Sequence, residues 1–446
     1  MASHIIDSEV YGAGFASPEM VTIWSDSNRV QKWLDVEAAL AQAQAELGMI
    51  PRAAAAEIAR KARAELVDLK AIGAGVSQVG HSLVPALRAL EHLCEDGAGE
   101  YIHYGATTQD IIDTGLVLQL KEAWGVLLRD LHDIREILVG HARRHKRTVM
   151  AGRTHGQQAL PITFGYKLAV WVDEIDRHLE RSAEAEKRIF VGNITGAVGT
   201  MSSFGAQGLE VQARALGRLG LGAPRICWHS ARDRIAEAAC LLVQIAMTLG
   251  KIANEVYNLQ RTELGEVSEP FHMGKVGSST MPHKQNPSMV ELVVVLARLV
   301  RGTLGPLTEV LLQEHERDAT CWRAEWAALP EACVYTGAIL HHMRRVLGGL
   351  EVREARMRTN LGLLGGLLLS ERVMLALGER IGKQTAHEVV YEVAMKAQAT
   401  GIDFMDALLA DARVAPHLSR DAIEQLLDPA GYIGLAPELV DRVVGR

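Results

Sequence analysis

The chain has 446 residues, roughly three domains of average size, and its 48% hydrophobic and 23% charged residues are typical of a globular protein. The formal net charge of −7 excludes a bulk electrostatic attraction to nucleic acid. No uninterrupted apolar run approaches the roughly 18 residues that a membrane span needs, and the N-terminus lacks the features of a signal peptide. We therefore expect a cytoplasmic protein with neither a nucleic-acid nor a membrane partner.

Five cysteines are present, an odd number that is widely spaced along the chain and contains no Cys-x-x-Cys pair. This pattern argues against a disulfide framework and against a zinc ribbon. We expect buried, reduced thiols and no metal site.

Apolar residues at helical spacing predict several long helices. In chain order these cover residues 108–147, 168–188 and 234–264, and a fourth begins after Pro287. From Leu242 to Leu259 the apolar residues of the third helix recur every three or four positions, as in helical bundles. Ser288 and Glu291 form a Ser-x-x-Glu pattern that predicts the cap of the fourth. Helices apolar on more than one side favour association of several copies of the chain.

The pattern as a whole predicts an all-α protein with three domains. We place an N-terminal helical domain at residues 1–106, a central bundle of long helices at 107–349 and a smaller C-terminal helical domain at 350–446. No alternating strand pattern and no short repeat is evident.

Two polar segments stand beside these helices. Tyr104–Asp110 opens the first long helix, where free backbone N–H groups and the hydroxyls of Thr107 and Thr108 suit a carboxylate. A plain N-cap would account for only one of the two threonines. Gly152–Gln158 lies between two helices, and the glycine next to His155 leaves space for a ligand, although a histidine in a turn is more often structural.

A third polar segment, GSSTMPHKQNP, runs from Gly277 to Pro287 between two long apolar helices. Counted from Glu266, this connection is far longer than the roughly 2 to 8 residues common in bundles, and such loops often carry function. Its serines and glycine can present hydroxyl and N–H groups to an anion, while a lysine and an asparagine add a charge and an amide. A plain connecting loop is the alternative, and the composition favours a functional one.

Together these segments resemble the fumarase/aspartase superfamily. The loop resembles its signature GSSxMPxKxN, GATTQD its G-x-T-S/T-x-D segment, and GRTHGQQALPITFG its Thr-His segment. VGNITGAVGT, from Val191, resembles a further shared turn, and the order of the four segments agrees from about residue 10 to residue 440. The resemblance implies a fumarase/aspartase-like fold and a homotetramer with a twenty-helix core and active sites shared between three subunits. It also implies β-elimination, or its reverse, on a small dicarboxylate without a cofactor.

The resemblance further implies roles for individual residues. Ser278 matches the serine that removes the Cβ proton, Lys284 the lysine that stabilises the adjacent carboxylate, and His155 the histidine that protonates or orients the leaving group. The positions that it assigns to substrate binding are Thr107, Thr108, Ser279, Met281, Asn286, His103, Gln158 and Arg317.

Two subfamilies are close by this resemblance, adenylosuccinate lyase and 3-carboxy-cis,cis-muconate cycloisomerase. The first carries phosphate-binding arginines where this sequence has Ala16 and Trp326, and each lost charge-assisted contact is worth about 1.5 to 3 kcal/mol. QEHERDATCWRAEWAALPEA, from Gln313, resembles the cycloisomerase, whereas His155 is typical of the lyases. We therefore expect a lyase of the cycloisomerase branch that releases fumarate from a substituted succinate. The cycloisomerase, adenylosuccinate lyase and a non-catalytic structural relative are the alternatives.

Overall fold

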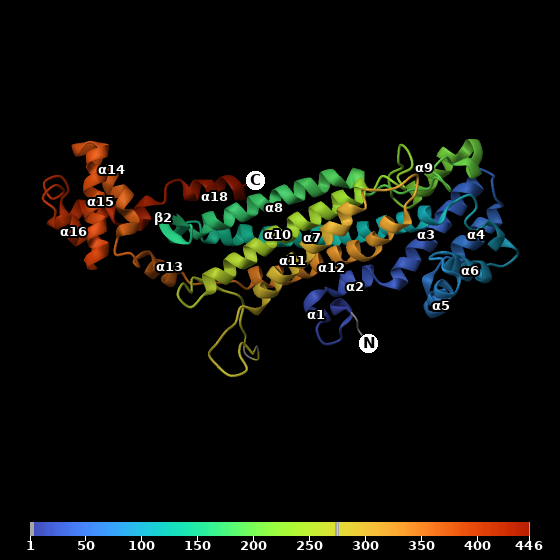
Figure 1. Cartoon of the computed structure of the whole chain (residues 1–446), viewed down its shortest axis with the longest axis horizontal. Coiled ribbons are helices and arrows are strands. Elements are labelled where there is room, and N and C mark those ends of the chain that lie inside the picture. The colour runs from blue at the N-terminus through green and yellow to red at the C-terminus, as the bar shows by residue number, and fades with distance from the viewer. Residues whose placement is uncertain (1–3, 273, 275, 446) are drawn as a thin grey trace. The chain divides into compact units, whose positions relative to one another are not determined.

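The computed structural model describes residues 4–272, 274 and 276–445, and the regular secondary structure of this part is almost entirely helical (Figure 1). Its α-helices are α1 (Gly12–Phe15), α2 (Pro18–Ile23), α3 (Asp26–Glu46), α4 (Arg52–Lys61), α5 (Leu69–Val79), α6 (Val84–Leu93), α7 (Thr108–Arg144), α8 (Phe164–Ile189), α9 (Gly208–Arg218), α10 (Asp233–Gln260), α11 (Ser288–Glu309), α12 (Ala319–Gly348), α13 (Glu354–Leu361), α14 (Ser370–Ile381), α15 (Lys383–Thr400), α16 (Phe404–Ala410), α17 (Arg420–Leu426) and α18 (Ala436–Val444). Short 3-10 helices lie at Ile5–Asp7, Ala64–Leu66, Ala98–Tyr101, Ser202–Gln207, Leu367–Leu369 and Pro429–Tyr432. The predicted all-α fold class is confirmed.

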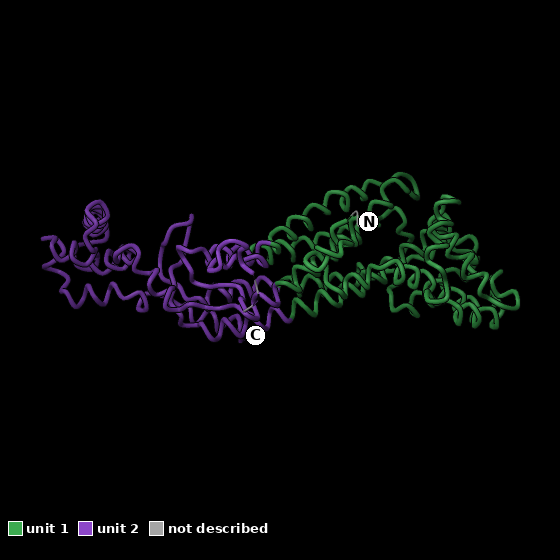
Figure 2. The backbone as a smooth tube through the Cα atoms, turned by 90° about the horizontal axis from the view of Figure 1, so that it is seen from below, with its two compact units in different colours: residues 1–132, 177–251, 292–342 green, residues 133–176, 252–291, 343–446 purple. Residues whose placement is uncertain are grey.

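The chain folds into two compact units (Figure 2). Unit 1 consists of residues 1–132, 177–251 and 292–342, and unit 2 of residues 133–176, 252–291 and 343–446. The long helices α7, α8, α10, α11 and α12 each contribute residues to both units. Because these units are interleaved along the sequence, they do not coincide with the three sequential domains, which remain a prediction.

The four long helices expected from apolar spacing correspond to α7, α8, α10 and α11. The cap of α11 differs from the expectation. The helix begins at Ser288, but the N–H groups of Met289 and Val290 each donate to the Glu269 carboxylate, with N–O distances of 3.1 Å. A side chain from the preceding loop therefore satisfies the first N–H groups of the helix.

The apolar seam of α10 is already buried within the single chain. Its members are between 0 and 2% exposed, namely Leu242, Ile245, Leu249, Ile252, Val256 and Leu259. Association of several copies, which the apolar helices favour, is therefore not needed to cover this seam, and an expectation that the seam is buried between subunits is wrong. Gly250 permits a close approach of α11, because a Cβ at this position would lie 2.7 Å from the Cβ of Ala297.

By length and hydropathy α10 could also cross a membrane, but 67% of its most apolar window is buried inside the structure, as in the core helix of a bundle.

The five cysteines differ in burial. Cys333 is buried and the other four are half-buried, so the expectation of buried thiols is confirmed only for Cys333.

Two small antiparallel sheets in unit 2 were not predicted. β1 (Val149–Thr154) pairs with β2 (Gln157–Thr163), and β3 (Val267–Ser268) pairs with β4 (Glu351–Val352). The first pair contains a register shift between Ala151 and Arg153, and burial does not alternate regularly along either strand. The period-two signal of a half-buried strand is therefore missing from the sequence.

A fully buried arginine joins three elements of unit 1. Arg232, just before α10, places both terminal nitrogens on the Asp113 carboxylate of α7 at 2.7 and 3.0 Å, and its Nε 2.8 Å from Glu325 of α12. The indole N–H of Trp322 donates to Asp113 at 2.8 Å. Burial raises the pKa of the Glu325 carboxyl, and Arg232 offsets only part of this rise. One guanidinium thus serves two buried carboxylates, so its removal would leave both without a cation.

We expect Arg232→Met to lower the free energy of unfolding by about 3 to 5 kcal/mol, because Asp113 and Glu325 would remain buried and unpaired. Urea denaturation at neutral pH measures this change. The matched control is Arg60→Met, which removes an exposed arginine paired with Glu57 and should leave the unfolding midpoint almost unchanged. Equal midpoints for the two variants would contradict the importance of the buried cluster.

Candidate active site

Polar side chains of unit 1 gather where α7 begins. The Arg317 guanidinium donates to the Thr107 hydroxyl at 3.0 Å and to the carbonyl oxygen of Ala197 at 2.6 Å. The Thr108 hydroxyl lies 3.3 Å from Nε2 of His81. Two hydroxyls, a guanidinium and an imidazole therefore meet at a helix N-terminus, where N–H groups and the helix dipole favour an anion. This arrangement can recognise a carboxylate.

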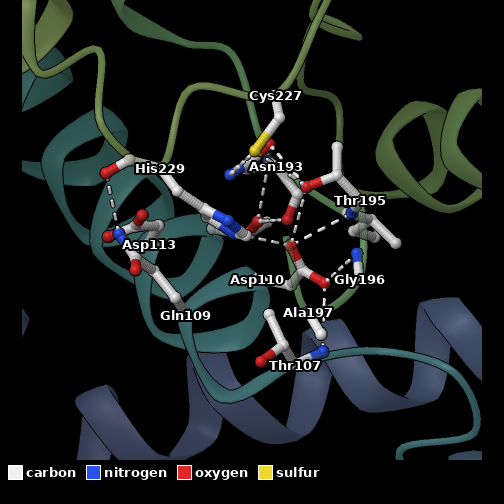
Figure 3. Close-up of polar contacts among 12 residues, drawn as sticks. Thr107, Gln109, Asp110, Asp113, Asn193, Thr195, Gly196, Ala197, Cys227 and His229 are labelled. Carbon is white, nitrogen blue, oxygen red and sulfur yellow. Dashed lines mark hydrogen bonds and ion pairs between the residues drawn. The ribbon is translucent and has the colours of Figure 1, made fainter. Parts of the chain in front are cut away.

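The Asp110 carboxylate fixes this end of α7 to a second loop (Figure 3). It is fully buried and accepts the backbone N–H groups of Thr107 at 3.1 Å, Thr195 at 3.0 Å and Gly196 at 2.9 Å. The Thr195 hydroxyl and Nε2 of His229 also contact it, at 3.3 and 3.0 Å. Because one carboxylate holds both the Thr107 turn and the turn that carries Ala197, it sets the positions of both partners of Arg317.

Nε2 of His229 contacts Asp110, whereas its Nδ1 is buried and has no hydrogen-bond partner among the described residues (Figure 3). Burial lowers the pKa of His229, but the hydrogen bond to Asp110 and the neighbouring Asp110 and Cys227 side chains outweigh it and raise the pKa to about 9. Burial raises the pKa of Cys227, but the neighbouring His229 and the hydrogen bond from Thr195 lower it by more, so the net change is downward. The thiol lies 3.2 Å from the Thr195 hydroxyl. An imidazolium is thus favoured beside Asp110 at neutral pH.

His103 precedes the threonines and is bound to a buried carboxylate. Its backbone N–H and its Nδ1 contact the two oxygens of Glu37 on α3 at 2.9 and 2.7 Å. Burial lowers the pKa of His103, but Glu37 and Asp110 raise it by more. The ring therefore anchors the segment that leads into α7, and its contact with substrate remains a prediction.

The predicted catalytic histidine lies in unit 2, at the tip of the β1–β2 hairpin. His155 is exposed and has a φ of 53°, and Gly156 after it has a φ of 76°. Gln158, on the next strand, donates to the carbonyl oxygen of Asn360 at 2.8 Å and so joins β2 to α13. The hairpin thus presents the imidazole to solvent, while the predicted binding residue Gln158 makes a structural contact.

The predicted serine base lies in the long loop between α10 and α11, which Figure 1 shows standing away from the ends of both helices (yellow). The Ser278 hydroxyl oxygen accepts the N–H groups of Thr280 at 3.3 Å and Met281 at 3.0 Å. Ser279, Met281 and Lys284 are exposed, and Asn286 is half-buried. Among the described residues of the chain, no hydrogen bond links this loop to His155.

Four residues of the site escaped the sequence-based prediction, namely His81, Asp110, Thr195 and His229. Asp110 lies in GATTQD and Thr195 in VGNITGAVGT, so the motifs contained two of them without revealing their contact. His229 stands alone in its segment and contacts Asp110 from 119 positions away, so no local pattern indicates it.

Comparison with known proteins identifies the class. Residues 13–302 match the family described as Lyase, and residues 366–443 match the adenylosuccinate lyase C-terminus. The helical fold and these matches define a lyase-type chain. It belongs to the fumarase/aspartase superfamily, as its four motifs predicted.

The relatives are similar over their full lengths. The chain is 48% identical to the N-acetyl-S-(2-succino)cysteine lyase of Dickeya dadantii and 50% identical to that of Enterococcus italicus, covering 100% of this chain and 98% and 97% of those proteins. It is 45% identical to the adenylosuccinate lyase of Methanocaldococcus jannaschii, over 100% of this chain and 96% of that one. The crystal structure of the 3-carboxy-cis,cis-muconate lactonizing enzyme from Pseudomonas putida has a TM-score of 0.93 at 37% identity, covering 98% of each chain.

We expect the His229–Asp110 pair to make stability depend on pH. A pKa raised in the folded state contributes stability that is complete below the unfolded value of about 6.5. That stability disappears as the pH rises through the folded value of about 9. The melting temperature of the wild type should therefore fall between these limits, and it should fall less in His229→Gln. Thermal melts at a series of pH values measure both slopes.

The exposed His417 provides the control for this measurement. His417→Gln should keep the wild-type slope. If His229→Gln also kept it, the histidine would not carry the extra proton.

Proposed function

We propose that the protein is a lyase that eliminates a thiol from a thioether-substituted succinate and releases fumarate. The observation that carries this proposal is the full-length identity of 48% and 50% to two N-acetyl-S-(2-succino)cysteine lyases. An N-acylated cysteine is accordingly the leaving group that we propose first. The 45% identity to an adenylosuccinate lyase makes that activity the second candidate.

The residues at the expected phosphate positions favour the thioether substrate. Ala16 is buried, and Trp326 packs edge-on against Trp322 with ring centroids 4.9 Å apart. The indole N–H of Trp322 is engaged by Asp113. Neither Ala16 nor Trp326 carries a positive charge, so these two positions cannot make the charge-assisted contacts that a nucleotide phosphate needs.

The cluster at the start of α7 supports recognition of the succinyl group. Thr107, Thr108 and Arg317 offer two hydroxyls and a guanidinium. Asp110 accepts the backbone N–H of Thr107 and so holds this residue in place. Arginine and hydroxyl donors at a helix N-terminus match the charge and geometry of a carboxylate.

The contacts of Ser278 support its proposed role as the base. Two N–H groups already point at its oxygen, and such donors stabilise an alkoxide more than a neutral hydroxyl. In the proposed step Ser278 takes the proton from the carbon next to one carboxylate, and Lys284 stabilises the negative charge that develops there. The electron pair forms the carbon–carbon double bond, the carbon–sulfur bond breaks, and the thiolate takes a proton from His155. The products are fumarate and a thiol.

A homotetramer in the cytoplasm, with sites shared between three subunits, forms part of the same proposal. Exposed apolar side chains of unit 1 support association, since Met247 on α10 and Val295 and Leu299 on α11 are 41, 44 and 38% exposed.

We expect purified protein to release fumarate from N-acetyl-S-(2-succinyl)cysteine with a kcat/KM at least about 10²-fold above that for adenylosuccinate, because two phosphate contacts are absent. Absorbance of fumarate and a thiol reagent measure the two products in parallel. Comparable rates on adenylosuccinate would instead favour the nucleotide lyase, and fumarate without thiol would exclude the thioether reaction.

We expect Ser278→Ala to reduce kcat by about 10²-fold or more while KM stays within several-fold, since the base is lost and the backbone donors remain. His283→Gln, in the same exposed loop, is the matched control and should keep wild-type kinetics. Near-normal turnover by Ser278→Ala would assign the proton abstraction to another group, with His155 as the first alternative.

A further inference from the structure

Unit 1 contains a cavity of about 350 Å³ whose lining residues come mainly from α3, α5, α7 and α12. This volume lies within the range of about 300 to 1,000 Å³ of small-molecule sites. Its walls are mostly apolar, and they include Trp33, Ile72, Ile112, Leu116 and Trp326. The cavity therefore has the size and the lining of a binding site for an apolar group.

The cavity lies along the same face of α7 as Thr108. Ile112 and Gln119, which line it, follow Thr108 by four and eleven residues, and both spacings return to nearly the same side of a helix. With a rise of about 1.5 Å per residue, the lining of α7 extends from about 6 to about 16 Å beyond Thr108. Ser82, another lining residue, follows His81, whose ring contacts the Thr108 hydroxyl at 3.3 Å. The cavity thus adjoins the carboxylate-recognising cluster.

Two glycines shape this space. At Gly115 a Cβ would lie 2.8 Å from Cδ1 of Trp33, so the indole packs directly on the α7 backbone and forms a firm wall. At Gly73 of α5, a lining residue, a Cβ would meet no atom within 4 Å. Gly73 is exposed as well as a lining residue, so a larger side chain at this position would meet no clash and could extend over the cavity.

The polar residues of the lining do not provide a free positive charge. Arg29 is the one cation among the described lining residues, and its guanidinium is paired with Asp26 at 2.5 Å. An anionic phosphate would find no unpaired partner there. An apolar chain or ring would bury its surface against the two indoles instead.

We infer that this cavity receives the apolar part of the leaving group, beyond the departing sulfur, and selects for an apolar chain or ring there; in an N-acylated cysteine that part is the acyl group, and the cysteine carboxylate lies outside the cavity. The inference rests on the proposed function, in which Thr107, Thr108 and Arg317 hold the succinyl group. The leaving group then extends from that cluster along α7 into the cavity, and the size of the open space at Gly73 sets the size of the accepted group.

The test fills the cavity at Gly73 and compares two substrates with the same reacting atoms, 2-(benzylthio)succinate and 2-(methylthio)succinate. In Gly73→Leu we expect KM to rise about tenfold or more for the benzyl compound and less than about twofold for the methyl compound. Gly73→Ala, which adds one carbon, should give a smaller rise for the benzyl compound. Gly125→Leu is the control, because Gly125 is an exposed helical glycine with open space around it and is not a lining residue.

A binding measurement separates the cavity from the chemistry. Benzyl mercaptan should quench tryptophan fluorescence saturably in the wild type and in Gly125→Leu, since Trp33 and Trp326 line the cavity, and not in Gly73→Leu. Equal KM changes for both substrates, or unchanged thiol binding in Gly73→Leu, would overturn the inference. If no thioether released fumarate, the proposed function would fail, and the mercaptan measurement alone would still decide whether the cavity binds apolar thiols.

Discussion

Unit 1 depends on two buried ion pairs between α7 and the short segment that precedes α10. Each pair joins a carboxylate on α7 to a basic side chain of that segment. Asp110 and Asp113 are three residues apart, as are their partners His229 and Arg232, so the two pairs match in spacing. All four side chains are at most 1% exposed. An unpaired charge at this depth would be costly, and the segment before α10 is therefore confined to one alignment on α7.

This alignment connects the core to the candidate site. The Asp110 carboxylate that accepts His229 also accepts the N–H groups of Thr107 and Gly196, and the Thr107 hydroxyl in turn accepts Arg317. The Asp110 carboxylate fixes the backbone of both turns, so Thr107 and Arg317 are positioned before any ligand arrives. Preorganisation of this kind is what the proposed site for a small dicarboxylate would require.

Local patterns in the sequence predict the helices well and the contacts between them poorly. α7, α8, α10 and α11 follow from the spacing of apolar residues, because each helix hides one face in the bundle. The β1–β2 hairpin escapes prediction because its strands lack alternation, and the cap of α11 comes from Glu269 rather than from Ser288. The motifs locate the threonines, His155 and the serine loop, whereas His229 and Glu37 reach the site across 119 and 66 positions of sequence. Pairing over such separations is decided by tertiary packing.

The turn that carries His155 has a consequence for how this position can vary. Both of its central residues have positive φ, 53° at His155 and 76° at Gly156, which is the backbone twist that suits a two-residue hairpin. Among side chains, asparagine, aspartate and histidine tolerate this region best, whereas β-branched residues are strained in it. Mutational tolerance is therefore narrow for conformational reasons alone. Asparagine can remove the imidazole while preserving the hairpin, but valine or isoleucine would disturb the turn and the adjoining strands together. The backbone thus restricts the chemistry that natural variation can explore at this point of the fold.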